Sequence, residues 1–191
     1  MLTDRFARAA AYAIELHRGQ MRKASSIPYV THLFAVCSLV LEDGGSEDEA
    51  LAALLHDGPE DRGGTAVLDE IRARFGDAVA AMVAGLSDAM PAAGEEKPPW
   101  RERKEAYLRH LESAPTSVLR VSLADKLHNA RSILVDLGLD GEDVWRRFNA
   151  DRAAQAWYYR ALLDVFQRRF GDSRNLPELA RVLGKLFPEP Q

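Results

Sequence analysis

Hydrophobic residues recur along nearly the whole chain at the three- and four-residue spacing of α-helices. No segment shows the sustained alternation of apolar and polar residues that a half-buried β-strand requires. The pattern therefore predicts an all-α fold of about eight to ten helices. We expect a single domain spanning residues 1–191, because no linker, repeat or change in composition divides the chain.

Helix-breaking residues divide the first third of the chain into three predicted helices. The first spans about residues 4–20 and the second about residues 30–42. Ser46 and Glu49 have the spacing of a capping box, which starts the third helix. That helix ends or kinks at Pro59, because proline cannot donate a hydrogen bond to the carbonyl four residues earlier. The buried stripe of the first helix is expected at Ala7, Ala10, Ala11 and Ile14.

The second half of the chain contains a loop and several further helices. Residues 89–99 are rich in proline, glycine and alanine and predict the loop. Residues 118–137 are apolar on several faces, which is typical of a central, buried helix. A long helix is expected from residue 142 to about 170, followed by a short helix that starts near Pro177. We expect these C-terminal helices, 142–186, to pack on the rest of the domain.

Composition narrows the range of functions. The chain has 25 lysine and arginine residues against 29 aspartate and glutamate residues, a net charge of −4, which argues against a general nucleic-acid-binding protein. A single cysteine, Cys37, excludes an intrachain disulfide and suits a reducing cytosol. The sequence shows no signal peptide and no run of about 20 apolar residues. We therefore expect a cytoplasmic protein with no nucleic-acid or membrane partner, and a homo-oligomer stays open.

The strongest local sign of chemistry is the pair His56-Asp57, which follows the apolar run 51–55. A charge at the end of such a run is costly unless something compensates it, and a metal ion can do so. The break at Gly58-Pro59 lets both side chains approach one ion from the end of the helix. The alternative is a histidine that only interacts with the negative end of the helix dipole.

Two further residues strengthen the metal interpretation. His32 stands at the start of the second predicted helix, and Asp125 lies within the central apolar helix. A buried aspartate needs a counter-charge or an ion, although Lys126 alone could neutralise it. Two imidazoles and two carboxylates suit Mn²⁺ or Fe²⁺ better than Mg²⁺, and Zn²⁺ is a further alternative.

The order of His32, His56-Asp57 and Asp125 resembles the H…HD…D signature of the HD phosphohydrolase superfamily. The chain is most similar to the alarmone hydrolases, both the Mesh1-like small enzymes and the hydrolase domain of Rel/SpoT proteins. The matching segments cover residues 5–135: HRGQMRKASSIPYVTH, AALLHDGPED, FGDAVAAMVAGLSD, RERKEAYLRHLE and LADKLHNAR. This resemblance implies an HD-type helical bundle that removes the 3′-pyrophosphate from (p)ppGpp, usually with Mn²⁺, and yields GDP or GTP and pyrophosphate.

The same resemblance implies roles for individual residues. It makes His32, His56, Asp57 and Asp125 the metal ligands. Glu60 and Asp61 complete the HDxxED pattern and would position and deprotonate the attacking water. Without the resemblance, this acidic pair would be interpreted as a solvated helix end.

Substrate contacts follow from the same comparison. The nucleotide-binding residues that it implies are Arg22, Lys23, Asn129 and Arg131. Stacking on a base is reasonable chemistry for an arginine side chain. His128 could approach the substrate, and a structural hydrogen bond is expected for His17. Weaker candidates for phosphate contacts, for which a solvated charge run is the alternative, are Lys97, Arg101, Arg103 and Lys104.

Two alternative functions stay open. The first keeps the metal chemistry but acts on another nucleotide, such as (p)ppApp or NADPH. The second is an HD domain that binds a nucleotide without cleaving it. The intact segment HDGPED argues against the second alternative, because loss of catalysis should first change Glu60 or Asp61.

Overall fold

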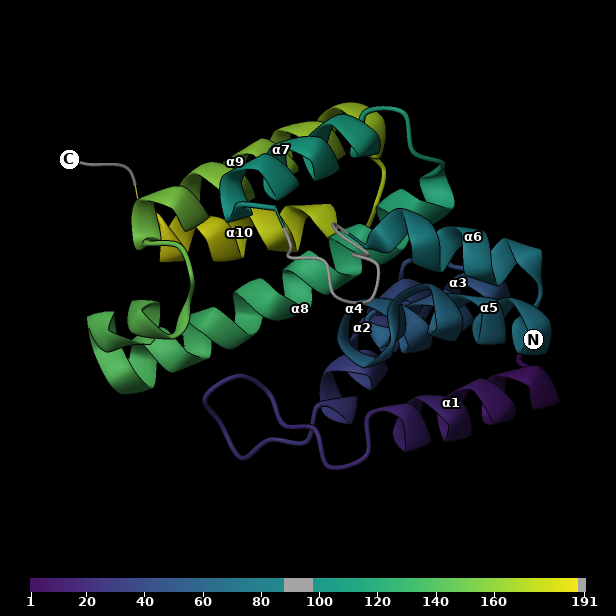
Figure 1. The fold of residues 1–191 in the computed structure, drawn as a ribbon. Helices are drawn as coiled ribbons and strands as arrows, with labels where there is room; N and C mark the ends of the chain where they lie inside the picture. The colour runs from purple at the N-terminus through teal and green to yellow at the C-terminus, as the bar shows by residue number, and fades with distance from the viewer. Residues whose placement is uncertain (88–97, 189–191) are drawn as a thin grey trace.

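The computed structural model describes residues 1–87 and 98–188, which are mostly helical. Apart from one isolated β-bridge between Met21 and Pro28, these residues contain no β-structure. The all-α prediction is therefore confirmed (Figure 1). The elements are α1 (Asp4–Leu16), α2 (Val30–Glu42), α3 (Glu47–Leu55), α4 (Gly58–Arg62), α5 (Gly64–Phe75), α6 (Asp77–Leu86), α7 (Trp100–Leu111), α8 (Thr116–Asp140), the 3₁₀ helix η1 (Gly141–Arg147), α9 (Arg152–Arg169) and α10 (Leu176–Leu186).

Helix α8 is the centre of this arrangement. In Figure 1 it runs diagonally between two groups of helices, with α1–α6 on one side and α7, α9 and α10 on the other. It contacts α2, α3 and α6 from the first group and α9 and α10 from the second. Ten of its residues are buried, including Leu119, Leu123 and Leu127. The prediction of a central buried helix is therefore confirmed, and α8 can hold side chains from both groups in one site.

The third helix begins and ends as its sequence predicts. The Ser46 side chain accepts a hydrogen bond from the Glu49 backbone N–H, and the Glu49 side chain accepts one from the Ser46 backbone N–H. All residues of α3 from Glu49 to Leu55 are buried. Helix α3 ends at Leu55, and the short helix α4 starts at Gly58 with Pro59 in its first turn. His56 and Asp57 therefore occupy the junction between two helices.

Three details of the predicted helices are wrong. The long helix expected from residue 142 is interrupted, because η1 ends in the extended residue Phe148 and the Asp151 side chain caps a new helix by accepting a hydrogen bond from the Ala154 N–H. The first helix ends at Leu16 and not near residue 20. Its fully buried residues are Ala9 and Ala13, whereas Ala7, Ala11 and Ile14 are exposed and Ala10 is half-buried.

Four sequence-based predictions are tested by the structure only in part or not at all. Most of the loop expected at 89–99 lies outside the described residues. Over the two described ranges, no helix combines the length and the hydrophobicity needed to cross a lipid bilayer. The cytoplasmic location and the homo-oligomer stay predictions.

Candidate metal centre

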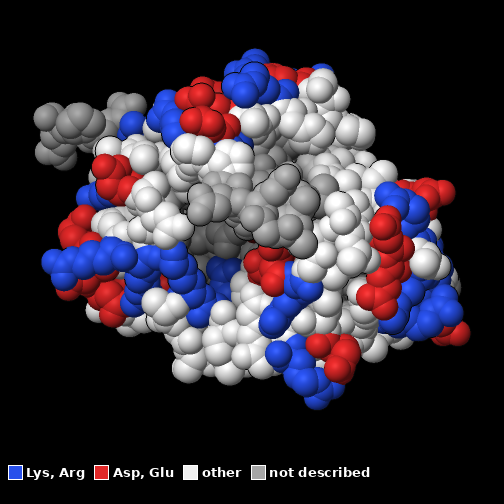
Figure 2. All heavy atoms as spheres, in the orientation of Figure 1, with Lys and Arg blue, Asp and Glu red and all other residues white. Residues whose placement is uncertain are grey.

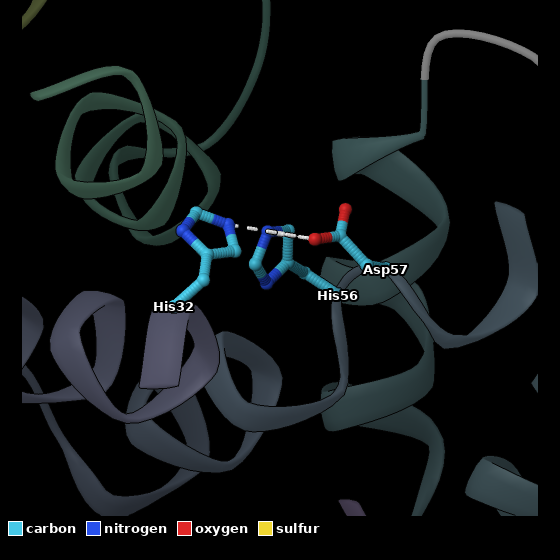
Figure 3. Close-up of side chains that lie close together, drawn as sticks. All are labelled: His32, His56 and Asp57. Atoms are coloured by element: carbon cyan, nitrogen blue, oxygen red, sulfur yellow. Dashed lines mark ion pairs between the residues drawn. The ribbon is translucent and has the colours of Figure 1, made fainter. Parts of the chain in front are cut away.

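Four side chains from three parts of the fold converge at the junction of α3 and α4. His32 comes from the first turn of α2, His56 and Asp57 from the junction, and Asp125 from the middle of α8. Figure 3 shows the His32 and His56 rings on the side toward which the Asp57 carboxylate points. His56 Nε2 lies 3.1 Å from Asp57 Oδ2, and His32 Nε2 lies 3.5 Å from the same oxygen. Asp125 Oδ1 lies 3.2 Å from His32 Nε2 and 3.7 Å from His56 Nε2.

The orientation of the His56 ring fits a metal ligand. Its Nδ1 lies 2.8 Å from the backbone carbonyl of Ala53, so Nδ1 carries the proton and donates it to that oxygen. The Nε2 atom is buried and has no hydrogen-bond partner among the described residues. An unpartnered buried nitrogen facing two carboxylates is costly unless a cation lies between them. His32, His56 and Asp57 each offer a donor atom within 4.8 Å of the others, so this group can hold a metal ion.

His128 contacts the Nδ1 side of the other imidazole, that of His32. The Nδ1 atoms of His32 and His128 lie 2.7 Å apart, so one of them donates to the other. Burial, with a further contribution from the Arg22 guanidinium, lowers the pKa of His128 to about 4. His128 is therefore neutral at physiological pH, and its Nδ1 can accept the proton of His32 Nδ1–H. This hydrogen bond leaves the Nε2 lone pair of His32 directed at the carboxylates.

The two carboxylates are held in their charged form. Burial opposes the charge of Asp57, but His56 and His32 in their protonated forms, whose positive charge a metal ion would replace, lower its pKa well below the usual value. For Asp125, burial is likewise outweighed, first by Lys126 and then by the two imidazoles, so its pKa is also well below the usual value. Tyr29 Oη donates to Asp57 Oδ2 at 2.6 Å. Both carboxylates are therefore available as anionic metal ligands.

Asp125 has two further contacts that fix its orientation. Lys126 Nζ donates to Asp125 Oδ2 at 2.5 Å, and Asn129 Nδ2 donates to Asp125 Oδ1 at 2.6 Å. Lys126 therefore neutralises Asp125, as the sequence suggested. The two imidazoles face the same carboxylate as well. Since Oδ1 also faces the two histidines, this oxygen is the one directed at the shared centre.

Glu60 and Asp61 lie one turn beyond Asp57, in α4. Glu60 lines the same small cavity as His56 and Asp57. Asp61 Oδ2 accepts a hydrogen bond from Gln20 Nε2 at 2.7 Å, and Gln20 Oε1 lies 2.9 Å from His17 Nδ1. Asp61 is thereby tied to the loop after α1, and His17 makes the structural hydrogen bond that its sequence context predicts.

Two adjoining cavities lie beside this centre. The smaller one, about 230 Å³, contains His56, Asp57, Glu60 and Asp125 together with four cationic side chains, Lys23, Arg103, Lys104 and Lys126. The larger one, about 720 Å³, shares several wall residues with it, among them Trp100, Phe148 and Tyr158. The smaller cavity is therefore suited to phosphates close to a metal, and the larger one to the remainder of a ligand.

The sequence-predicted substrate residues line the larger cavity, but each already has a protein partner. Arg22 Nη2 donates to Asn129 Oδ1 at 2.7 Å, which joins the loop before α2 to α8. Lys23 Nζ donates to Asn149 Oδ1 at 3.3 Å. Arg131 makes two hydrogen bonds to the Glu178 carboxylate, at 3.0 and 2.5 Å.

The weaker phosphate candidates divide into different places. Arg103 and Lys104 line the smaller cavity, whereas the guanidinium of Arg101 lies 3.2 Å from the ring centre of Trp157. Lys97 lies outside the described residues. The composition of this charged segment alone did not show which of its side chains line the cavity and which stack on an aromatic ring.

Sequence reasoning missed the roles of two residues. It associated His128 with the substrate, whereas the structure also pairs this ring with His32. Gln20 received no role, although its amide joins His17 to Asp61. The spacing HRGQ was visible in the sequence, but a contact across 41 residues was not.

Charge on the surface agrees with the composition. On the face drawn in Figure 2, lysine and arginine side chains are interspersed with aspartate and glutamate side chains. The face drawn is therefore not uniformly basic.

Comparisons with known proteins agree with the geometry of this site. A family model described as "HD domain" matches residues 9–155. The human guanosine-3′,5′-bis(diphosphate) 3′-pyrophosphohydrolase MESH1 is 30% identical over 180 residues, covering 93% of this chain and 91% of that protein. The MESH1 protein of Xenopus tropicalis is 35% identical over 128 residues, covering 65% and 67%. A solved structure titled as a metazoan ortholog of SpoT that hydrolyzes ppGpp matches with a TM-score of 0.73 and 25% identity, covering 95% of both chains. The chain therefore belongs to the HD domain family, and to the branch of that family that contains the MESH1 proteins.

Proposed function

We propose that this chain is a metal-dependent phosphohydrolase that removes the 3′-pyrophosphate from (p)ppGpp and yields GDP or GTP and pyrophosphate. One observation carries the proposal. Two imidazole Nε2 atoms and two charged carboxylates converge at the edge of a cavity lined by four lysine and arginine side chains. The sequence similarity to human MESH1 over nearly the full chain supports the choice of an alarmone as substrate.

In this proposal, the ion is held by His32, His56, Asp57 and Asp125. This donor set is mixed nitrogen and oxygen, which favours Mn²⁺, with Fe²⁺ and Zn²⁺ as alternatives. When bound, such an ion supplies Lewis-acid polarisation of a phosphoryl group. The protein prepares the site by keeping both imidazoles in the tautomer whose Nε2 is free, through Ala53 and His128.

The acidic pair Glu60 and Asp61 would act on the attacking water. The water would attack the phosphorus bound to the ribose 3′-oxygen, and the bond from that phosphorus to the 3′-oxygen would break. The water's proton would pass to a carboxylate, and the departing 3′-oxygen would take up a proton and become the ribose hydroxyl. Glu60 lines the smaller cavity, and Gln20 fixes the orientation of the Asp61 carboxylate. A carboxylate that is not a metal ligand but lies beside one is suited to this proton transfer.

The remaining polar residues would bind the two ends of the nucleotide. Lys104, Lys126 and Arg103 would neutralise the pyrophosphate in the smaller cavity. Arg22, Asn129 and Arg131 would contact the nucleoside part in the larger cavity, and Lys23 lies where the two cavities meet. The planar guanidinium of Arg22 is suited to stacking on a base.

The test is a substrate panel with the full chain and Mn²⁺. The protein is incubated with ppGpp, pppGpp, ppApp and NADPH, and the products are identified by chromatography. Release of pyrophosphate from ppGpp is the expected result. Phosphate release from NADPH alone would instead assign the enzyme to the alternative substrate. Absence of turnover with all four would leave a nucleotide-binding domain.

Variants separate the metal ligands from the acid–base pair. Glu60→Gln and Asp61→Asn should keep full metal content, measured by mass spectrometry, and lose most turnover. Asp125→Ala should lose the metal itself, because a charged ligand is gone and Lys126 is left without its partner. Wild-type turnover in both acid–base variants would contradict their assigned role, and full metal content in Asp125→Ala would contradict the ligand assignment.

A further inference from the structure

The larger cavity contains an acidic side chain in an otherwise cationic lining. Among the described residues that line it, Asp136 is the only carboxylate, and the cationic side chains are Arg22, Lys23, Lys104, Lys126, Arg131 and Arg147. A carboxylate repels the phosphates for which such a lining is suited. Asp136 is therefore better suited to a part of the ligand that is uncharged and rich in hydrogen-bond donors.

The position of Asp136 along α8 identifies that part. Asp125 and Asp136 are eleven residues apart, which is about 16 Å of helical rise and three turns, to within about 20° of rotation. Asp125, Asn129 and Asp136 thus share one face of α8, which extends from the metal centre along the larger cavity. A nucleotide with its cleaved phosphate near Asp125 can therefore extend along this face toward Asp136.

The local contacts of Asp136 leave acceptor capacity for a ligand. Its Oδ2 accepts a hydrogen bond from Arg147 Nη1 at 3.0 Å, and the side chain is 40% exposed. No described residue donates to its Oδ1. Arg147 also forms an ion pair with Asp140, which does not line the cavity. Neutralising Arg147 therefore does not require Asp136.

We propose that Asp136, with Arg147 beside it, recognises the hydrogen-bonding edge of guanine and excludes adenine; this inference rests on the proposed function. Guanine presents two adjacent donors, N1–H and the 2-amino group, which a carboxylate can bind together. The neighbouring O6 is an acceptor, which suits a guanidinium. Adenine presents the N1 lone pair at the same place, so its approach would set an acceptor against a carboxylate.

The test compares the guanine and adenine alarmones in three proteins: wild type, Asp136→Asn and Asp140→Asn. Asp140→Asn is the matched control, because it removes the other carboxylate bound to Arg147 without changing the cavity wall. Asp136→Asn should lower kcat/KM for ppGpp by about 10- to 100-fold. It should leave ppApp unchanged or improve it, since an asparagine side chain matches adenine. Asp140→Asn should change either value by less than about twofold.

Two results would overturn the inference. Equal losses for ppGpp and ppApp in Asp136→Asn would make the residue a structural one. A selective loss in Asp140→Asn as large as that in Asp136→Asn would assign the effect to Arg147 alone. Thermal melts of all three proteins distinguish these results from misfolding.

Binding measurements make the inference independent of hydrolysis. Calorimetric titration of each protein with GDP and with ADP measures base preference without turnover. Tighter binding of GDP by wild type, lost in Asp136→Asn but kept in Asp140→Asn, supports the inference even if no alarmone is cleaved, in which case only the proposed function fails. Equal affinity of the wild-type protein for GDP and ADP would overturn the role of Asp136 even if ppGpp is cleaved.

Discussion

Replacement of His128 tests whether its contact with His32 supports the candidate metal centre. His128→Ala removes the ring whose Nδ1 lies 2.7 Å from His32 Nδ1, while every proposed metal ligand stays in place. Without this acceptor, His32 can turn or exchange the proton between its two nitrogens. Either change reduces the fraction of molecules in which His32 Nε2 faces the carboxylates with its lone pair free.

The expected magnitude follows from the kind of contact. Loss of the partner that orients a metal-binding histidine weakens metal affinity by about 10- to 100-fold, or about 1.4–2.7 kcal/mol. The contact lies at a buried ring, since His32 is only 1% exposed, but His128 itself is half-buried and lines the larger cavity, so water can partly replace the lost acceptor. The effect should therefore lie toward the lower end of this range. His128→Asn restores a polar side chain at the same place and should recover part of the affinity.

Direct titration with Mn²⁺ measures this effect without substrate. The dissociation constant is obtained by calorimetry, or from the electron paramagnetic resonance signal of free Mn²⁺, for wild type and for both His128 variants. His110→Ala is the matched control, because it removes an exposed histidine from α7. The reasoning is refuted if His128→Ala binds Mn²⁺ as tightly as wild type, or if His110→Ala weakens binding equally.

Two further predictions concern other contacts. Gln20→Leu removes the donor to Asp61 and should lower kcat for ppGpp about tenfold, with little change in KM or metal content. The loss is limited to about tenfold because this hydrogen bond is solvent-exposed. An unchanged kcat would show that Gln20 does not orient Asp61. Asp43→Ala removes a buried carboxylate that accepts a hydrogen bond from Ser173 Oγ at 3.0 Å and pairs with Arg120 at 3.3 Å. This change should lower the free energy of unfolding, measured in urea, by about 3 kcal/mol. A loss below about 1 kcal/mol would contradict this stabilising role.

Local signals in the sequence account for what could be predicted of the site. His56-Asp57 follows an apolar run and precedes Pro59, so both its burial and its position at a helix end are visible without the fold. Asp125 within an apolar helix is an equally local signal. The order of these residues, together with His32, then resembled a family. What the structure adds is that all four side chains face one another.

Contacts between distant segments could not be predicted. His32 and His128 are separated by 96 positions and meet only because α2 packs against α8. Arg131 likewise pairs with Glu178 across the contact between α8 and α10. A single sequence contains no information on which helix faces cross, so the partner of such a side chain is unknown until the fold is known.

Predicted helix ends and buried faces were wrong where apolar residues do not mark one face of the helix clearly. The first helix carries alanines on several faces, so the pattern did not show that Ala9 and Ala13 are the buried ones. Between residues 142 and 170, apolar residues continue across the break. There the Asp151 cap, a short-range signal, outweighs the longer hydrophobic period.

The continuity of α8 constrains how this protein can change. One uninterrupted helix of 25 residues carries a side chain of the candidate metal centre and part of the wall of the larger cavity. A substitution can alter the chemistry at one turn and leave the distance between turns unchanged. Insertion of one residue between Asn129 and Asp136 would instead rotate everything beyond it by about 100° and turn Asp136 away from the cavity. Relatives that accept other nucleotides are therefore expected to differ here by replacement of side chains, with the length of this interval kept constant.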